Sequence, residues 1–242
     1  MKITLGSLFD GIGGFPLCAE WNGIVPLWAS EIEKVPVEIT KKHFHDMKHL
    51  GDITKIDGAK IEPVDVITFG SPCQDLSLAG KRKGLAGERS GLFTKAINII
   101  RRMQYSTGGQ YPRYAVWENV PGAFSSNKGL DFRTVLEEIT KTEIPMPSGG
   151  KWAEAGMVEC PNCQVAWRTM DAQFWGVPQR RKRIYLVADF RGKCAAEILF
   201  ECKSLPRDTA ESQDKRESPA ENPGTSIKAT SEPTYHAKGQ DH

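Results

Sequence analysis

The stretch Gly-Ser-Pro-Cys-Gln occupies residues 70–74 and directly follows a short apolar run at residues 64–69. Such a run bounded by turn residues is typical of a buried parallel strand. Pro72 ends this strand abruptly, because proline has no backbone N–H to donate. Ligands of open α/β sheets bind at the carboxyl ends of the strands. The sequence therefore predicts a candidate nucleophile, the thiol of Cys73, at that edge, although an isolated cysteine is more commonly a core residue.

Residues 3–9 read as a first strand, followed by a glycine turn at residues 10–14 and a helix at residues 15–21. This arrangement presents backbone N–H groups to a nucleotide-like ligand. A second strand at residues 24–30 ends at Glu31, 20 residues past Gly11, where a ribose-binding carboxylate belongs. A dinucleotide-binding oxidoreductase is therefore a rival interpretation. It requires G-x-G-x-x-G, however, and Pro16 stands where the third glycine should be.

The rest of the chain continues the alternation of strands and helices. Helices are predicted over residues 33–44, 92–103 and 130–142, a short strand end over 51–54, strands over 114–117 and 184–188, and an irregular segment over 145–167. A basic cluster at residues 179–183 leads into the last strand, and we expect at least one of its side chains to face the cleft. The pattern predicts an α/β fold, Rossmann-like, with a mostly parallel sheet and helices on both faces.

The composition limits the classes of protein to which this chain can belong. The 242 residues suffice for one α/β domain, and 32 Lys and Arg against 30 Asp and Glu give a formal charge of +2. Contact with nucleic acid must therefore come from local clusters, such as the basic, glycine-rich loop at residues 78–91. Six irregularly spaced cysteines, no signal peptide and no membrane-length apolar run predict reduced thiols in the cytoplasm. The single C-x-x-C at Cys160 and Cys163 is half a zinc site, so no metal is predicted.

Five blocks, at residues 8–15, 51–53, 70–77, 118–120 and 179–185, resemble in order and spacing the DNA cytosine-C5 methyltransferases. The resemblance extends from residue 5 to about residue 190. It implies that the thiolate of Cys73 adds to C6 of a cytosine flipped out of double-stranded DNA, because C5 alone is a poor nucleophile. Glu118 would hydrogen-bond N3, Arg181 would contact O2 with Arg183 close by, and Asn119 would hold the site together.

The resemblance also implies S-adenosylmethionine as the methyl donor. Its pocket would be formed by Phe9, Gly11, Gly13, Glu31, Asp52, Ile53, Pro72 and Leu92. Glu31 would bind the ribose hydroxyls and Asp52 the adenine amino group, although a helix or turn cap is the ordinary role for such an aspartate. The loop at residues 78–91 would close behind the flipped base.

The family's target-recognition region and final helix have no counterpart after residue 200. The predicted organisation is therefore a catalytic domain over residues 1–203 and a low-complexity linker or disordered tail over 204–242. The resemblance then implies an N-terminal piece of an enzyme, or a second polypeptide that supplies the remainder, in a bacterial or phage restriction-modification setting. A tRNA methyltransferase and a donor-binding half without turnover remain open. A cysteine hydrolase is disfavoured, since no histidine lies near Cys73 in the sequence.

Overall fold

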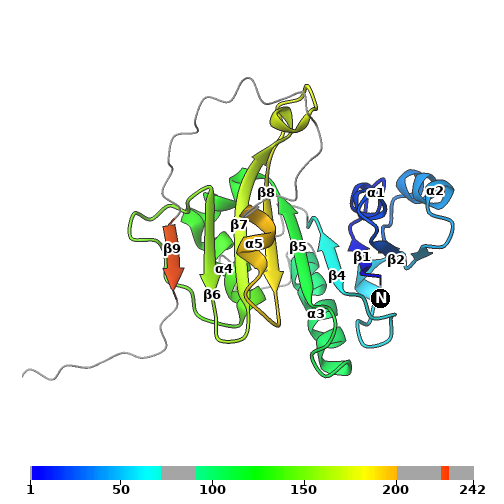
Figure 1. The fold of residues 1–242 in the computed structure, drawn as a ribbon, viewed down its shortest axis with the longest axis horizontal. Coiled ribbons are helices and arrows are strands. Elements are labelled where there is room, and N and C mark those ends of the chain that lie inside the picture. Colours follow the sequence, from blue (N-terminus) through cyan, green and yellow to red (C-terminus); the bar gives the residue numbers. More distant parts are fainter. Residues whose placement is uncertain (1, 72–90, 201–224, 229–242) are drawn as a thin grey trace, which may run out of the picture.

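The computed structural model describes residues 2–71, 91–200 and 225–228 of the chain. Within these residues one nine-stranded sheet has the order β3-β2-β1-β4-β5-β8-β7-β6-β9 (Figure 1). Its first five strands pair in parallel and are β1 (Thr4–Leu8), β2 (Val25–Ser30), β3 (Lys48–His49), β4 (Val66–Phe69) and β5 (Tyr114–Asn119). The predicted mostly parallel sheet is confirmed, and the run before residue 70 is one of its central strands.

The other half of the sheet is antiparallel. Strand β8 (Lys182–Asp189) runs against β5, and β7 (Gln164–Asp171) and β6 (Ala155–Glu159) follow in a meander. The prediction of an irregular segment over residues 145–167 is wrong, because β6 and β7 form a hairpin whose turn is the Cys160–Cys163 stretch. Strand β9 (Thr225–Lys228) pairs in parallel with β6, so the segment predicted as a linker or tail contributes one strand.

Helices cover both faces of the sheet, as predicted. Helix α4 packs its Phe132 against Trp167 of β7, whereas α5 packs against the adjacent Ala166, whose side chain points to the opposite face. In Figure 1, α5 lies in front of β7 and β8. The helices are α1 (Gly14–Trp21), α2 (Lys34–His43), α3 (Gly91–Ser106), α4 (Leu130–Thr140) and α5 (Ala195–Phe200), with 3-10 turns η1 (Ile53–Lys55), η3 (Pro121–Phe124), η4 (Ser126–Gly129) and η5 (Ala172–Trp175).

An aromatic cluster forms the main core. Phe93 of α3, Trp117 of β5 and Phe132 of α4 are fully buried. The ring centroid of Trp117 lies 6.3 Å from that of Phe93 and 6.2 Å from that of Phe132. This packing fixes the height of β5 relative to α3 and α4, and so fixes where the carboxyl end of β5 lies. None of the helices in the described part of the chain is long and apolar enough to span a bilayer.

Candidate active site

Glu118 and two arginines meet at the carboxyl end of β5. The Glu118 Oε1 atom lies 3.0 Å from Nε of Arg183 and 3.7 Å from Nη2 of Arg181. Glu118 and Arg183 are each about one-fifth exposed, so this ion pair is partly shielded from water. The antiparallel insertion of β8 beside β5 creates the contact, because it carries the basic cluster back to the edge at which β5 ends. Three of the five predicted catalytic residues are therefore brought together.

The Glu118 carboxylate also affects the pKa of Tyr185. It lies opposite Glu118 in the register of β5 and β8. Burial, and then the negative charge of Glu118, raise the pKa of the Tyr185 phenol above its ordinary value. The phenol therefore stays protonated at this edge of the sheet.

The end of β4 is tied to the end of β5 by two side chains. Trp117 donates from Nε1 to Oγ of Ser71 over 3.1 Å, and Asn119 donates from Nδ2 to the Ser71 carbonyl over 3.1 Å. Gly70 lies close to the carboxylate, since a Cβ at that position would lie 3.2 Å from Glu118 Oε2, a tight contact. Asn119 thus holds together the two strand ends that flank the site. Pro72 and Cys73, which follow Ser71, lie outside the described residues.

The two glycines of the turn after β1 have different surroundings. Gly13 has a φ of +86°, and a Cβ there would lie 2.7 Å from the Phe44 ring. The absence of a side chain at Gly13 therefore leaves room for that ring. Gly11 has a φ of +58°, and a Cβ there would meet nothing within 4 Å. Of the pair, Gly11 is the one that borders open space. Phe9 also has a positive φ of 54°, which is unusual for a residue with a side chain.

Glu31 joins this turn to β2. Its Oε2 atom accepts a hydrogen bond from the Gly11 N–H over 2.8 Å, and its Oε1 atom accepts from the N–H groups of Ile32 and Glu33. These three bonds leave about one of the four lone-pair positions of the carboxylate open. Glu31 therefore both shapes the turn and retains limited capacity for a ligand.

Asp52 is an N-cap rather than the end of a strand, which corrects the prediction for residues 51–54. Its Oδ1 atom accepts from the backbone N–H of Thr54 over 2.9 Å at the start of η1. That backbone hydrogen bond, together with the Thr54 hydroxyl, lowers the pKa of Asp52. Ile53 is buried and Leu92 is half-buried against the core. The donor contacts predicted for these residues stay predictions.

Asp10 is a candidate site residue that the sequence reasoning missed. It follows β1 immediately, is only 7% exposed, and neither carboxylate oxygen has a hydrogen-bond partner among the described residues. Burial raises the pKa of Asp10 to about 6; the nearby Ser7 hydroxyl, which lies outside hydrogen-bond geometry, opposes this, and the charge of Glu31 adds to it. An acid between an apolar strand and a Gly-x-Gly turn was the available signal, but its burial is a tertiary property. Buried carboxylate oxygens without a protein partner are satisfied in folded proteins by water or by a bound polar group.

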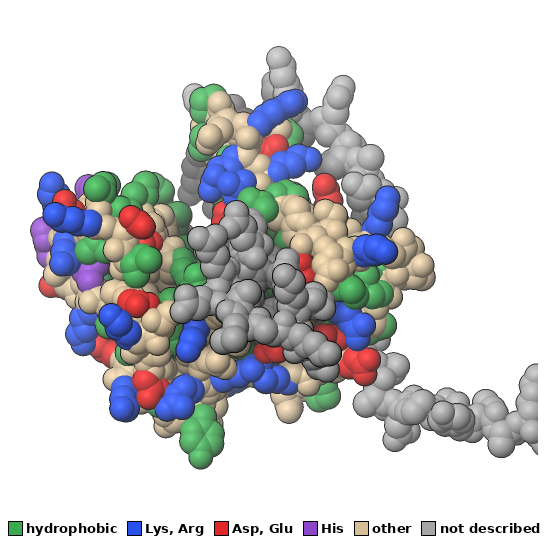
Figure 2. Space-filling view, turned by 180° about the vertical axis from the view of Figure 1, so that it is seen from behind, with side chains coloured by type: hydrophobic (Ala, Val, Ile, Leu, Met, Phe, Trp, Pro, Cys, Tyr) green, Lys and Arg blue, Asp and Glu red, His purple; other side chains and the backbone are tan. Residues whose placement is uncertain are grey.

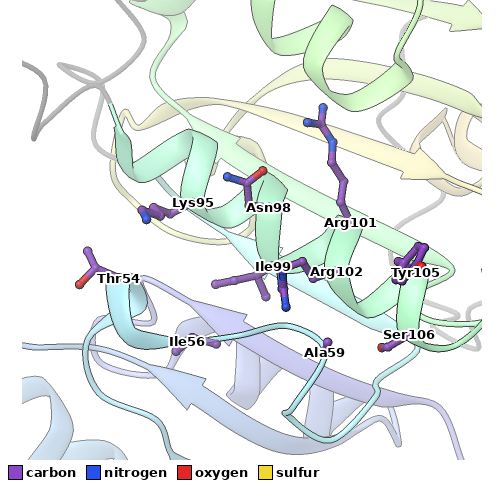
Figure 3. A pocket seen from close by; sticks show the side chains of 10 residues that line it. All are labelled: Thr54, Ile56, Ala59, Lys95, Asn98, Ile99, Arg101, Arg102, Tyr105 and Ser106. Atoms are coloured by element: carbon purple, nitrogen blue, oxygen red, sulfur yellow. The ribbon is translucent and has the colours of Figure 1, made fainter.

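One cavity of the described residues lies away from this edge. It has a volume of about 780 Å³ between η1 and the outer face of α3, and Figure 3 shows Ile56 and Ile99 beside it and Arg101 pointing away. None of the predicted site residues within the described ranges lines it. Residues 72–90, which include most of the loop predicted at 78–91, lie outside the described part of the chain. Among the described residues, no group of three or more His, Cys, Asp or Glu is arranged to hold a metal ion.

The strand order, the glycine turn after β1 and the acid at the end of β5 define the class of S-adenosylmethionine-dependent methyltransferase folds. The Dnmt2 methyltransferase of S. pombe shares this fold, with a TM-score of 0.58 and 19% identity over 87% of this chain and 58% of that one. The chain belongs to the C-5 cytosine-specific DNA methylase family, whose model matches residues 3–236.

Curated relatives are similar over most of this chain. The type II methyltransferase M.BsuFI of Bacillus subtilis is 32% identical over 77% of the chain. A protein of Escherichia phage P1, named as a DNA N-6-adenine-methyltransferase, is 31% identical over 89% of it. The chain spans only 39% and 32%, respectively, of these two proteins. The name of the phage P1 protein specifies N6 of adenine and the name M.BsuFI specifies no base, so the target of this chain has to be argued from its own residues.

Proposed function

We propose that this chain transfers a methyl group from S-adenosylmethionine to C5 of cytosine in DNA, through a covalent bond between Cys73 and C6 of a flipped base. The observation that carries the proposal is the placement of Glu118, paired with Arg183, beside Gly70 and Ser71. The chain reaches Cys73 two residues after Ser71. An acid and two guanidinium groups therefore meet at the sheet edge from which the sequence continues to Cys73.

The chemistry assigns each residue a step. Cys73 adds its sulfur to C6, which turns the C5 atom of the ring into an enamine-type nucleophile. Negative charge then develops on the ring, and Glu118 stabilises it by sharing a proton at N3. Arg181 is half-exposed and only 3.7 Å from Glu118, so its guanidinium is free to donate to the cytosine O2. After methyl transfer, loss of the C5 proton expels the Cys73 sulfur and restores the aromatic ring.

The residues at the end of β1 fit the proposed donor. S-adenosylmethionine supplies an electrophilic methyl group on a sulfonium centre, and it also carries an ammonium group. Asp10 offers buried carboxylate oxygens without a partner, which is what a bound cation would satisfy. Gly11 borders open space, and Glu31 retains an acceptor position for a ribose hydroxyl. Asp52 and Ile53 would hold the adenine, with Leu92 and Phe9 as apolar walls.

Incubation with methyl-labelled S-adenosylmethionine tests the proposal. Label should appear in 5-methylcytosine of duplex DNA, and Cys73→Ala should abolish it while Cys18→Ala, at an exposed thiol, should not. Label in N6-methyladenine would contradict the proposed target atom. Preferential labelling of tRNA would replace DNA with tRNA as the substrate, and donor binding without turnover in any preparation would reduce the chain to a binding domain.

A further inference from the structure

The basic cluster at residues 180–183, of which Lys182 and Arg183 lie in β8, is divided between the Glu118 site and a second cavity. Successive residues of a strand point to opposite faces. Arg181 and Arg183 point toward Glu118. Lys182 lies opposite Asp171 in the register of β7 and β8, and it lines a different cavity together with Arg180. The proposed reaction therefore uses Arg181 and Arg183 and leaves Arg180 and Lys182 without a role.

This second cavity, which we call the tip cavity, has a volume of about 530 Å³ and is lined by Asp171, Gln173, Phe174, Arg180 and Lys182. It belongs to the end of the β7–β8 hairpin, which projects beyond the rest of the sheet in Figure 1. The projection is held at its base. Asp171 Oδ1 accepts from the Arg181 N–H over 3.0 Å, and the Ala172 N–H donates to the Arg181 carbonyl over 3.1 Å.

The two cations of the tip cavity are available to an anion. Arg180 and Lys182 are exposed, and neither forms an ion pair within the described ranges. Among the described residues, Asp171 contributes the one carboxylate that lines the cavity, and its oxygens already accept bonds from the N–H groups of Gln173 and Arg181 and from the Gln173 side-chain amide. Figure 2 shows Lys and Arg side chains gathered on the projection, next to hydrophobic ones.

Large apolar side chains are exposed at the same place. Phe174 is 79% exposed, Trp175 49% and Val177 47%. Exposed aromatic rings beside unpaired cations are typical of surfaces that hold nucleic acid, because the rings pack against bases or sugars while the cations contact phosphates. The charge of the tip cavity thus favours a polyanion over an apolar protein partner.

We propose that the tip cavity binds the backbone of duplex DNA beside the target cytosine, with Arg180 and Lys182 on phosphates and Phe174 packed against the nucleotide that they hold. The proposal rests on the proposed function for the identity of the nucleic acid as DNA. It adds a contact on the face of β8 opposite Glu118, so that the hairpin straddles the strand rather than touching it only at the reacting base.

Fluorescence anisotropy of the 242-residue chain with a labelled mixed-sequence duplex tests this. Arg180→Ala/Lys182→Ala should weaken binding and reduce the slope of log K against log salt by about 1.8, the loss of two phosphate contacts. Phe174→Ala should weaken binding about fivefold or more at fixed salt. The charge-matched control is Lys34→Ala/Lys41→Ala, two exposed lysines of α2, which should leave the slope unchanged.

Three outcomes would overturn the proposal: no duplex binding by the unmodified chain, tip variants that bind as well as it does, or a control that lowers the slope equally. If Phe174→Ala leaves DNA affinity intact but shifts the chain to a smaller species in sedimentation, the tip is a protein contact instead. Titration calorimetry with S-adenosylmethionine separates this inference from the proposed function. Unchanged donor affinity in the tip variants is expected, whereas no donor binding by the unmodified chain would defeat the proposed function alone.

Discussion

The side-chain amide of Asn119 donates a hydrogen bond to the backbone carbonyl of Ser71, 48 residues earlier in the chain, over 3.1 Å. Both residues are buried. The bond joins the carboxyl ends of β4 and β5, and so couples the position of Glu118 to the residue that stands two before Cys73. Asn119 is therefore a positioning residue, and its substitution should lower both the stability of the fold and the activity.

Asn119→Ala should destabilise the fold by about 1–3 kcal/mol, because it leaves the buried Ser71 carbonyl without this donor. Urea unfolding measures the change. The control is Asn22→Ala, whose side-chain amide also donates to a backbone carbonyl but at an exposed position, and it should cost less than about 0.5 kcal/mol. Equal losses in the two variants would contradict the structural role of Asn119.

Glu118→Gln should lower methyl transfer by about 10²–10⁴-fold, the usual contribution of a positioned proton-transfer group, and should leave the fold intact because the side chain keeps its volume. Single-turnover methylation of DNA, in a preparation that is active before substitution, measures the rate. Donor affinity should not change. A Glu118→Gln enzyme with the original rate would remove this carboxylate from the mechanism.

Asp10→Asn should change how stability depends on pH. The pKa of Asp10 in the folded protein is about 6, above the unfolded value of 3.8, so the folded state binds this proton more tightly. The contribution of Asp10 to the free energy of unfolding is fully present below pH 3.8 and is lost as the pH rises through 6. Asp10→Asn should therefore raise the free energy of unfolding at pH 8, by up to about 3 kcal/mol, and have little effect near pH 4. The same gain at both pH values would show that ionisation of Asp10 is not the cause.

Gly13→Ala and Gly11→Ala form a matched pair. At Gly13 the left-handed backbone and the contact with the Phe44 ring act together, and we expect a loss of about 2–4 kcal/mol. At Gly11 only the backbone term applies, and we expect about 1 kcal/mol. Donor affinity should show the reverse order, because Gly11 is the glycine that borders open space. Thermal unfolding and donor titration of both variants provide the measurements.

Asp52 can be tested for a donor contact separately from its capping role. Asparagine is as good an N-cap as aspartate, whereas Asp52→Ala removes the cap at a cost of about 1 kcal/mol. Both Asp52→Asn and Asp52→Ala should weaken S-adenosylmethionine binding, by about 1–3 kcal/mol, if the carboxylate accepts from the adenine amino group. Full donor affinity in a stable Asp52→Asn variant would limit this residue to capping η1.

The sequence by itself determined which segments are strands and helices near the site, and why. Runs such as residues 64–69 and 114–117 are apolar because both faces of a central parallel strand are buried, and that requirement is visible locally. The acid of Glu118, the proline after Ser71 and the glycine turn after β1 stand at strand ends, so their common edge followed from the parallel order alone. The hairpin of β6 (five residues) and β7 (eight residues) escaped this reasoning, because its turn carries a C-x-x-C that resembles a metal motif.

Only the tertiary structure decided which of these residues touch. The antiparallel entry of β8 beside β5 sets a contact between residues 118 and 183, and no local pattern encodes a pairing over that separation. It also places Arg181 and Arg183 near Glu118 and Arg180 and Lys182 on the tip cavity. The sequence alone cannot tell which side chains of a strand face a given site, because that depends on the neighbouring strands and their register. Asp10 shows the same limit: an acid after a strand is ordinary in sequence, and its burial without a partner arises only when β1, β2 and β4 pack together.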